Sequence, residues 1–272
     1  MDLLTVLKAV VLGVVQGLTE FLPVSSSGHL VIGSQLLGFH EPGIFFEVCL
    51  HCGTLFAVLL VFRNELRQMV RALFATPAVR RADPELARFF RWNINIVVAT
   101  LPAVAVGLFL KDSIDLLFDS VLVAYAMLAV SGVLMLLTPL LRERGAEVTW
   151  PRALAIGAAQ AVAIMPGLSR SGSTIFAGML FDINRETAAR FSFIMSIPAI
   201  LGAVVLEVGD LCAAPLPASE FIAIAAGTAA ALVTGYGAIV LLLSIARRGK
   251  LYWFGYYCLA VSGLGLAWHF WG

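Results

Sequence analysis

The sequence predicts an all-α polytopic membrane protein with six transmembrane helices and two re-entrant helical hairpins, arranged as inverted-topology repeats. The first observation is composition: apolar residues make up 60% of the 272 residues, charged residues 13%, and the mean hydropathy is +0.95. The second is a set of apolar segments of membrane-spanning length, and the third is the clustering of basic residues between them. Soluble domains are nearer half apolar and a quarter charged, so this composition predicts a surface that faces lipid.

Six segments are long and apolar enough to cross a bilayer, which takes about 20 residues in a helix. They are 44–62, 92–110, 121–141, 187–208, 219–245 and 251–271. Each is expected to cross the membrane once.

Two further apolar stretches, 3–37 and 152–180, are interrupted in the middle by polar residues. The interruptions read Pro23-Val-Ser-Ser-Ser-Gly-His29 and Pro166-Gly-Leu-Ser-Arg-Ser-Gly-Ser-Thr174. Irregular backbone at membrane depth is tolerated only where it is buried in protein or lines a cavity. Each stretch is therefore predicted to be a re-entrant hairpin, made of two short helices that meet at the polar break.

Basic residues mark one side of the membrane. Fifteen of the 18 Lys and Arg residues fall in the segments 63–91, 142–152, 181–190 and 246–250. Cytoplasmic loops carry an excess of Lys and Arg, so these segments are predicted to be cytoplasmic, with 63–91 an amphipathic connector at the headgroups. The alternation holds only if both hairpins return to the side they entered, which places both termini in the periplasm. No separate soluble domain is expected within 1–272.

The two hairpins resemble each other, which predicts repeat halves at about 1–145 and 146–272. Four positions recur after a shift of 144, namely Gly13, Gln16, Ser27 and Gly28 against Gly157, Gln160, Ser171 and Gly172. A hairpin followed by three spans inverts the second copy relative to the first. In inverted repeats the broken helices meet near the membrane midplane and build a site there.

The first hairpin carries candidates for acid–base chemistry. Gln16 and Glu20 share one helical face at i, i+4 spacing, and an ionisable residue inside a membrane segment is a functional candidate by default. The serines at 25–27 can cap the second half-helix, or one can act as a nucleophile. His29 can accept a proton from a nucleophile or attack phosphorus itself.

The second hairpin carries candidates for anion binding. Arg170 is the one arginine outside the four basic segments, and its planar guanidinium fits two phosphate oxygens. The other candidate phosphate ligands are hydroxyls and backbone amides near the start of the following half-helix, at Gly167, Ser169, Ser171, Ser173 and Thr174, with Ser27 from the first hairpin. Phosphate-binding groups on one hairpin and acid–base groups on the other are what phosphoryl transfer requires.

Two further groups of polar residues leave alternatives open. Glu47, His51 and Thr54 form a polar stripe at i, i+4 and i+7, where Glu47 either enters the site, through a metal, or makes an interhelical hydrogen bond. The four cysteines, at positions 49, 52, 212 and 258, lie in or beside apolar stretches, and buried thiols are the preferred interpretation. The net charge of +1 gives no indication of a nucleic-acid partner.

Together the motifs resemble the undecaprenyl-diphosphate phosphatase family, also called bacitracin-resistance proteins. The resemblance rests on Gln16-Gly-Leu-Thr-Glu-Phe-Leu-Pro-Val-Ser-Ser-Ser-Gly-His29, Phe46-Glu-Val48 and the second break, and covers essentially the whole chain. It implies an enzyme of the bacterial inner membrane that hydrolyses undecaprenyl diphosphate to undecaprenyl phosphate, recycles the carrier for peptidoglycan synthesis and opens toward the periplasm.

The resemblance also implies site residues and partners. It makes Glu20, Ser26, His29 and Arg170 the matched catalytic positions, with a divalent cation, Mg²⁺ or Ca²⁺, held by Glu20, Gln16 and Glu47. The partners it implies are the polyprenyl diphosphate lipid and membrane lipids, and a homodimer is expected as a further possibility.

The chain departs from the family pattern at two of these positions. Gln16 stands where many members have Glu, which removes one potential metal ligand, and His51 stands where Gln is expected. Whether Ser26 or His29 attacks phosphorus stays open, with Ser26 as nucleophile and His29 as its base slightly favoured. The rival function is a lipid-carrier flippase or secondary transporter on the same inverted repeat.

Overall fold

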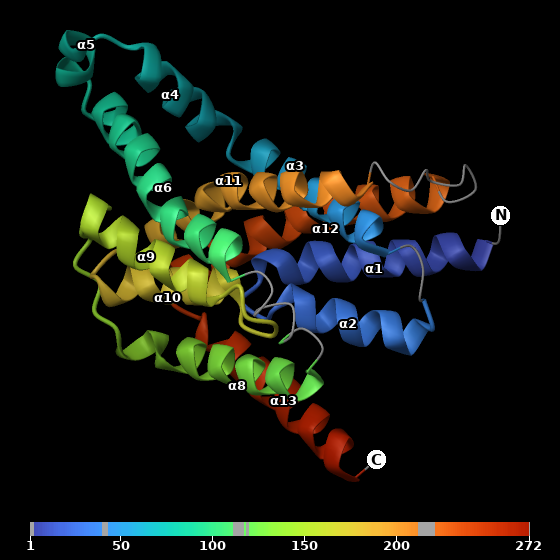
Figure 1. Cartoon of the computed structure of the whole chain (residues 1–272). Helices are drawn as coiled ribbons and strands as arrows, with labels where there is room; N and C mark the ends of the chain where they lie inside the picture. Colours follow the sequence, from blue (N-terminus) through green and yellow to red (C-terminus); the bar gives the residue numbers. More distant parts are fainter. Residues whose placement is uncertain (1–2, 40–42, 111–116, 118–119, 212–220, 272) are drawn as a thin grey trace.

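The computed structural model describes residues 3–39, 43–110, 117, 120–211 and 221–271, and within these ranges the chain is helical with no strand. Figure 1 shows the helices in chain order. Their bounds are α1 Leu3–Phe21, α2 Ser26–Leu37, α3 Gly43–Val61, α4 Arg63–Phe74, α5 Pro77–Ala82, α6 Pro84–Phe109, α8 Val121–Leu137, the 3₁₀ turn Thr138–Leu140, α9 Trp150–Val162, α10 Arg170–Leu180, α11 Arg185–Leu211, α12 Phe221–Arg247 and α13 Tyr252–Trp271.

Five helices of the described part are long and apolar enough to cross a membrane, and a bent pair makes a sixth candidate. The five are Leu3–Phe21, Pro84–Phe109, Val121–Leu140, Arg185–Val205 and Phe221–Arg247. The bent pair joins Phe45–Val61 to Arg63–Phe74 at 76°. An all-α chain with five to six apolar spans is thus confirmed. The predicted span 251–271 forms the helix α13, which is not among these candidates, whereas Leu3–Phe21, predicted to be half of a hairpin, is one of them.

The first polar break separates α1 from α2, which pack side by side (Figure 1). The chain leaves α1 at Phe21 and starts α2 at Ser26, and Pro23 in between cannot donate to a continuing helix. Ser25 adopts a left-handed φ of 68°, which is uncommon for a residue with a Cβ. The chain turns from α1 into α2 at this residue, while α1 itself is held along α12.

The second break separates α9 from α10 and is held by two close contacts. Gly167 has a φ of +86°, and a Cβ there would collide with the backbone of Ala124 in α8. Gly157 places α9 against α6 in the same way, since a Cβ there would collide with the backbone of Ala99. The break is therefore positioned by neighbouring helices on both sides.

The basic segments gather at one end of the molecule, where α4, α5 and the beginning of α6 lie in Figure 1. The helix α6 begins at Pro84, eight residues before the predicted start of its span at 92. Asp83 caps it, because its carboxylate accepts hydrogen bonds from the amides of Glu85 and Leu86. The segment 63–91 is therefore two short helices and the first turns of a long one.

Candidate active site

Glu20 is the hub of a buried polar cluster between the two breaks. Only 6% of the residue is exposed. Its Oε1 forms an ion pair with the Arg170 guanidinium, while its Oε2 accepts hydrogen bonds from Ser26 Oγ at 2.7 Å and from Gln16 Nε2 at 3.0 Å. The sequence prediction that Glu20, Ser26 and Arg170 share one site agrees with this geometry.

The cluster forms because each residue occupies a defined position on its helix. Gln16 and Glu20 lie one turn apart near the end of α1, Ser26 is the first residue of α2, and Arg170 is the first residue of α10. The hairpins also touch directly, since Ser171 Oγ donates to the Leu22 carbonyl at 3.3 Å. Helix starts and ends thus meet at one point, where a side-chain amide, a hydroxyl and a guanidinium surround one carboxylate.

A cavity of about 590 Å³ opens beside this cluster. One end is polar, and its polar lining consists of Glu20, Ser25, Ser26, Ser27, His51, Gln160, Ser169 and Arg170, with Thr19 and Thr100. The other end is apolar and is built by α6 between Ala103 and Leu108 and by α11 between Pro198 and Val205. A polar end joined to an apolar one matches a ligand with an anionic head and a hydrocarbon tail.

His29 is placed differently from the other predicted catalytic residues. Its Nδ1 lies 2.8 Å from the Ser25 carbonyl and its Nε2 lies 2.7 Å from the Tyr257 hydroxyl. The residue is not part of the cavity lining, and its hydrogen bonds within the described residues do not reach Glu20, Ser26 or Arg170. Ser26 donates to Glu20 instead, so the role of His29 as base for Ser26 stays a prediction.

The polar stripe on α3 brings one of its residues to the site. His51 lines the cavity, with its Nδ1 3.1 Å from Gln16 Nε2 and 3.9 Å from Glu20 Oε2. Glu47 is exposed and lies outside the cavity lining, while Thr54 donates to the carbonyl of His51. The spacing indicated that the three residues share one helix face, and the contact with Gln16 identifies His51 as the residue that faces the site.

Several predicted phosphate ligands have structural partners. Ser169 caps α10 by accepting from the Gly172 amide at 3.1 Å, and Ser27 Oγ accepts from the Gly167 amide at 3.5 Å. Thr174 Oγ1 donates to the Arg170 carbonyl at 2.8 Å. Of the candidates on the second hairpin, Ser169 and Arg170 line the cavity, whereas Gly167, Ser171, Ser173 and Thr174 do not. Their contact with phosphate stays a prediction.

Within the described residues, the protein side chains alone do not form a binding site for a divalent cation. Both oxygens of Glu20 already accept from Arg170, Ser26 and Gln16, and Glu47 is exposed on α3. Nowhere in the described ranges do three His, Cys, Asp or Glu side chains converge. Gln16 Oε1 is a buried acceptor without a partner there, and one amide oxygen does not make a metal site.

The cysteines of the described part are free thiols. Cys258 is fully buried and donates to the Pro23 carbonyl at 3.4 Å, and Cys49 and Cys52 are half-buried. The prediction of buried thiols is thus confirmed for Cys258, whereas Cys49 and Cys52 are only half-buried. Cys212 lies outside the described residues.

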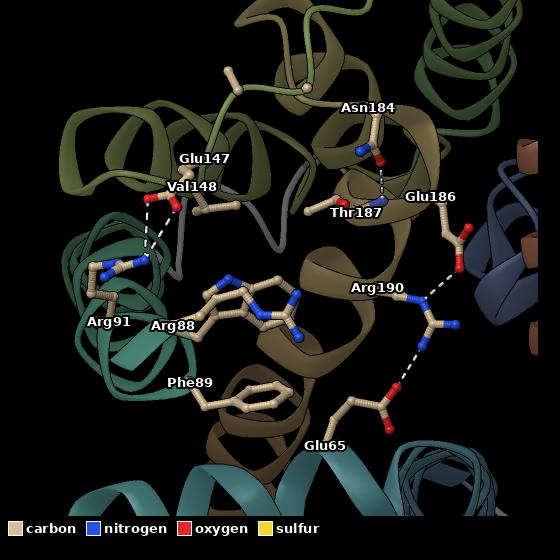
Figure 2. Close-up of a pocket in the computed structure, with 13 residues that line it drawn as sticks. Glu65, Arg88, Phe89, Arg91, Glu147, Val148, Asn184, Glu186, Thr187 and Arg190 are labelled. Atoms are coloured by element: carbon tan, nitrogen blue, oxygen red, sulfur yellow. Dashed lines mark hydrogen bonds and ion pairs between the residues drawn. The ribbon is translucent and has the colours of Figure 1, made fainter. Parts of the chain in front are cut away.

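A second cavity, of about 450 Å³, lies among the basic segments (Figure 2). Three of its lining residues are arginines and three are glutamates. Two of the arginines pair with the three glutamates, while Arg88 pairs with Glu85 outside the lining. Arg190 lies between Glu65 and Glu186, and Arg91 bonds both carboxylate oxygens of Glu147 at 3.2 Å (Figure 2). The first of these contacts joins α4 to α11, and the second joins α6 to the segment before α9, so the lining is a joint between helix ends that is held by ion pairs.

Comparison with known proteins gives one consistent result. The family described as bacitracin resistance protein BacA matches residues 9–264. A protein named undecaprenyl-diphosphatase from Desulfatibacillum aliphaticivorans is 42% identical, over 97% of this chain and 99% of its own length. Proteins of the same name from Desulfosudis oleivorans and Rubrobacter xylanophilus are 44% and 41% identical, and each alignment covers 96% of this chain and 97% of the relative.

Proposed function

This chain belongs to the BacA family of bacitracin resistance proteins, and we propose that Glu20, Ser26 and Arg170 form the catalytic centre of its undecaprenyl-diphosphatase activity. The observation that carries the assignment is the single carboxylate of Glu20. One of its oxygens accepts a hydrogen bond from the hydroxyl of Ser26, and the other forms an ion pair with Arg170. The nucleophile Ser26 and the anion-binding Arg170 therefore both contact Glu20, the proton acceptor.

In the proposed reaction, Ser26 Oγ attacks the terminal phosphorus while its proton passes to Glu20 Oε2, 2.7 Å away. The new Oγ–P bond forms as the bond from phosphorus to the bridging oxygen breaks, and undecaprenyl phosphate leaves. Water then attacks the phosphoserine and releases inorganic phosphate. The proton on Glu20 returns to the serine oxygen, and the proton of the water is released to solvent.

Arg170 supplies the positive charge for the phosphoryl group. Its side chain is 23% exposed at the edge of the cavity, whereas that of Glu20 is 4% exposed. The guanidinium can therefore turn its outer nitrogen atoms to phosphate oxygens while it still contacts Glu20. Charge neutralisation and positioning are the main contributions that a protein makes to phosphoryl transfer.

We place the first isoprene units of the lipid between α6 and α11. Gly107 and Gly202 lie in this apolar end of the cavity, and a Cβ added to either would meet open space. The surrounding Val104, Leu108 and Val205 are exposed, which suits a surface shared with lipid tails. The diphosphate then lies at the polar end, beside Ser26 and Arg170.

The proposed topology is a pair of inverted repeats with the active site open to the periplasm. The helices α2 and α10 have 12 and 11 residues, or roughly 18 and 16 Å at 1.5 Å per residue. Both are too short for an apolar core about 30 Å thick, which supports re-entrant hairpins. The apolar end of the cavity lies at the ends of α6 and α11 away from the basic segments, which supports a periplasmic opening and periplasmic termini.

A divalent cation, Mg²⁺ or Ca²⁺, stays part of the proposal on the strength of the family resemblance alone. Magnesium commonly uses substrate phosphates together with one or two protein ligands, and Gln16 and Glu20 are the candidates nearest the nucleophile. A homodimer likewise remains a prediction. Neither enters the reaction steps described above.

Purified protein in detergent provides the direct test. We expect it to release inorganic phosphate from undecaprenyl diphosphate, and the variant Arg170→Ala to lose this activity while it still elutes as a folded species. Hydrolysis by Arg170→Ala at the wild-type rate would contradict the assignment of the catalytic centre. A wild-type protein that releases no phosphate under any added cation would contradict the phosphatase activity itself.

A further inference from the structure

Gln160, near the end of α9, is a buried amide that lacks the partners such a group normally has. The residue is 2% exposed. Neither its Nε2 nor its Oε1 finds a hydrogen-bond partner within the described residues. It lines the same cavity as Glu20, Ser26 and Arg170. The amide is therefore shielded from bulk solvent and borders the space where the substrate is expected.

Burial without a partner is unfavourable for an amide, because its hydrogen bonds to water are lost and not replaced. Native proteins leave few such groups, and each requires an explanation. A packing role does not supply one, since a methionine or leucine fills a similar volume without the cost. A ligand that bonds the amide in the complex does supply one.

The equivalent residue of the first hairpin makes the contrast clear. Gln16 lies 144 positions earlier, and its Nε2 donates to the carboxylate of Glu20 and lies 3.1 Å from His51 Nδ1. In the second hairpin the position that matches Glu20 is Ile164, so no carboxylate follows Gln160 one turn later. Within the described residues, the side-chain amide nitrogen of Gln16 thus has protein hydrogen-bond partners, whereas that of Gln160 has none.

The packing of α9 holds the backbone of Gln160 beside the cavity. Gly157, almost one turn earlier, packs against the backbone of Ala99 in α6 so closely that a Cβ would collide with it. The following Ala161 is also buried. The helix is therefore fixed in rotation next to Gln160, and its amide group is presented to the cavity before any substrate arrives.

We propose that Gln160 is a substrate-binding residue, whose Nε2 donates a hydrogen bond to an oxygen of the diphosphate. This inference rests on the phosphatase activity proposed above and extends it. The ionised diphosphate has acceptor atoms only, so it matches the Nε2 donor. The Oε1 acceptor takes a water from the hydration shell of the diphosphate. Gln160 and Arg170 then hold the diphosphate from opposite sides of the second break.

The variant Gln160→Met tests the proposal, because methionine has a similar shape and no strong hydrogen-bonding group. We expect the KM for undecaprenyl diphosphate to rise about tenfold, the effect of one lost hydrogen bond to a charged group. We expect the melting temperature of the unliganded protein to stay equal or to rise. Gln160→Glu, which adds a negative charge at the same place, is expected to raise KM further.

Asn95→Leu is the matched control for a buried amide with a structural role. Asn95 is 4% exposed, but its Nδ2 donates to the Val148 carbonyl at 2.6 Å, and it lies outside the cavity lining. Its replacement is expected to lower the melting temperature and to leave KM unchanged. Gln160→Met should therefore change KM, and Asn95→Leu should change the melting temperature.

Binding can be measured without catalysis by using farnesyl methylenediphosphonate, whose P–C–P linkage resists hydrolysis. We expect this probe to raise the melting temperature of the wild type and to protect Gln160→Met much less. Equal protection together with an unchanged KM would overturn the proposal and leave Gln160 as a packing residue or a site for water. Failure of the proposed activity would look different, because the wild type would then release no phosphate.

Discussion

The hydroxyl of Tyr257 in α13 lies 2.7 Å from Nε2 of His29, and the two rings stack with 15° between their planes. On the other side of the imidazole, Nδ1 lies 2.8 Å from the carbonyl of Ser25. A carbonyl can only accept, so Nδ1 carries the proton and Nε2 of the neutral ring accepts from Tyr257. The carbonyl of Ser25 thereby sets the tautomer of a residue predicted to be catalytic, and Tyr257 in α13 orients its ring.

Tyr257→Phe keeps the stacked ring and removes only this hydrogen bond. If His29 acts as the base for Ser26, as the family resemblance implies, kcat should fall roughly tenfold on loss of this orienting partner. If the proton passes to Glu20 instead, as proposed above, kcat should stay the same. Tyr256→Phe changes the neighbouring residue of the same helix and should leave kcat as it is. In a His29→Gln background, Tyr257→Phe should have no further effect, and an undiminished effect there would show that Tyr257 does not act through His29.

Glu20→Gln removes the proposed proton acceptor of Ser26 and the partner of Arg170. Loss of a positioned general base costs about 100- to 10,000-fold in rate, and we expect kcat for phosphate release to fall by that amount. The exposed Glu85→Gln is the control and should retain full activity. Wild-type turnover by Glu20→Gln, with the protein folded, would exclude Glu20 as the acceptor.

Gly202→Leu tests the placement of the lipid between α6 and α11. The added side chain meets open space in the protein, so we expect normal folding and a KM for undecaprenyl diphosphate raised about tenfold, through loss of apolar contact with the tail. Gly237→Leu is the matched control, because it also lies in a helix with open space around its Cα. A substrate as short as isopentenyl diphosphate should be hydrolysed equally by both, and equal KM values for the long lipid would contradict the placement.

Gly157→Ala tests the contact that positions α9. The methyl group would collide with the backbone of Ala99, and overpacking of this kind typically costs about 1–3 kcal/mol. We expect a lower melting temperature in detergent, accompanied by lower activity because the second break shifts. Gly237→Ala, with no such neighbour, should leave the melting temperature unchanged.

Removal of divalent cations tests the cofactor implied by the family resemblance. We expect a chelator to abolish phosphate release and Mg²⁺ or Ca²⁺ to restore it. Gln16→Glu places a second carboxylate one turn from Glu20, so it is expected to lower the cation concentration needed for half-maximal activity. Full activity of the chelated wild type would argue against the cation, and an unchanged requirement in Gln16→Glu would argue against position 16 as a ligand.

Local signals in the sequence were sufficient to locate the two breaks and their chemistry. Proline, glycine and serine within apolar runs end helices through the backbone itself, so the ends of α1 and α9 could be predicted. The inverted repeat predicted that the two breaks meet, but it assigned Arg170 to phosphate and did not predict the ion pair with Glu20. The early start of α6 carried a signal too, since Asp83 and Pro84 form a capping sequence.

The contacts that the sequence did not predict join segments far apart in the chain. Tyr257 lies 228 residues from His29, and nothing in the local pattern distinguishes it from Tyr256. Gln160 was recognised only as a repeat of Gln16, because its lack of partners depends on which side chains surround it. The ambiguous stripe on α3 was resolved for the same reason, by the contact of His51 with Gln16.

The ion pair between Arg170 and Glu20 also bears on which anions the enzyme tolerates. A free orthophosphate arriving from outside must compete with a carboxylate that already occupies the guanidinium, and it brings no tail to compensate. After hydrolysis the same carboxylate lies beside the departing phosphate and repels it, while its contact with Arg170 is kept. We therefore expect inorganic phosphate to inhibit the enzyme only weakly and to leave it readily after hydrolysis.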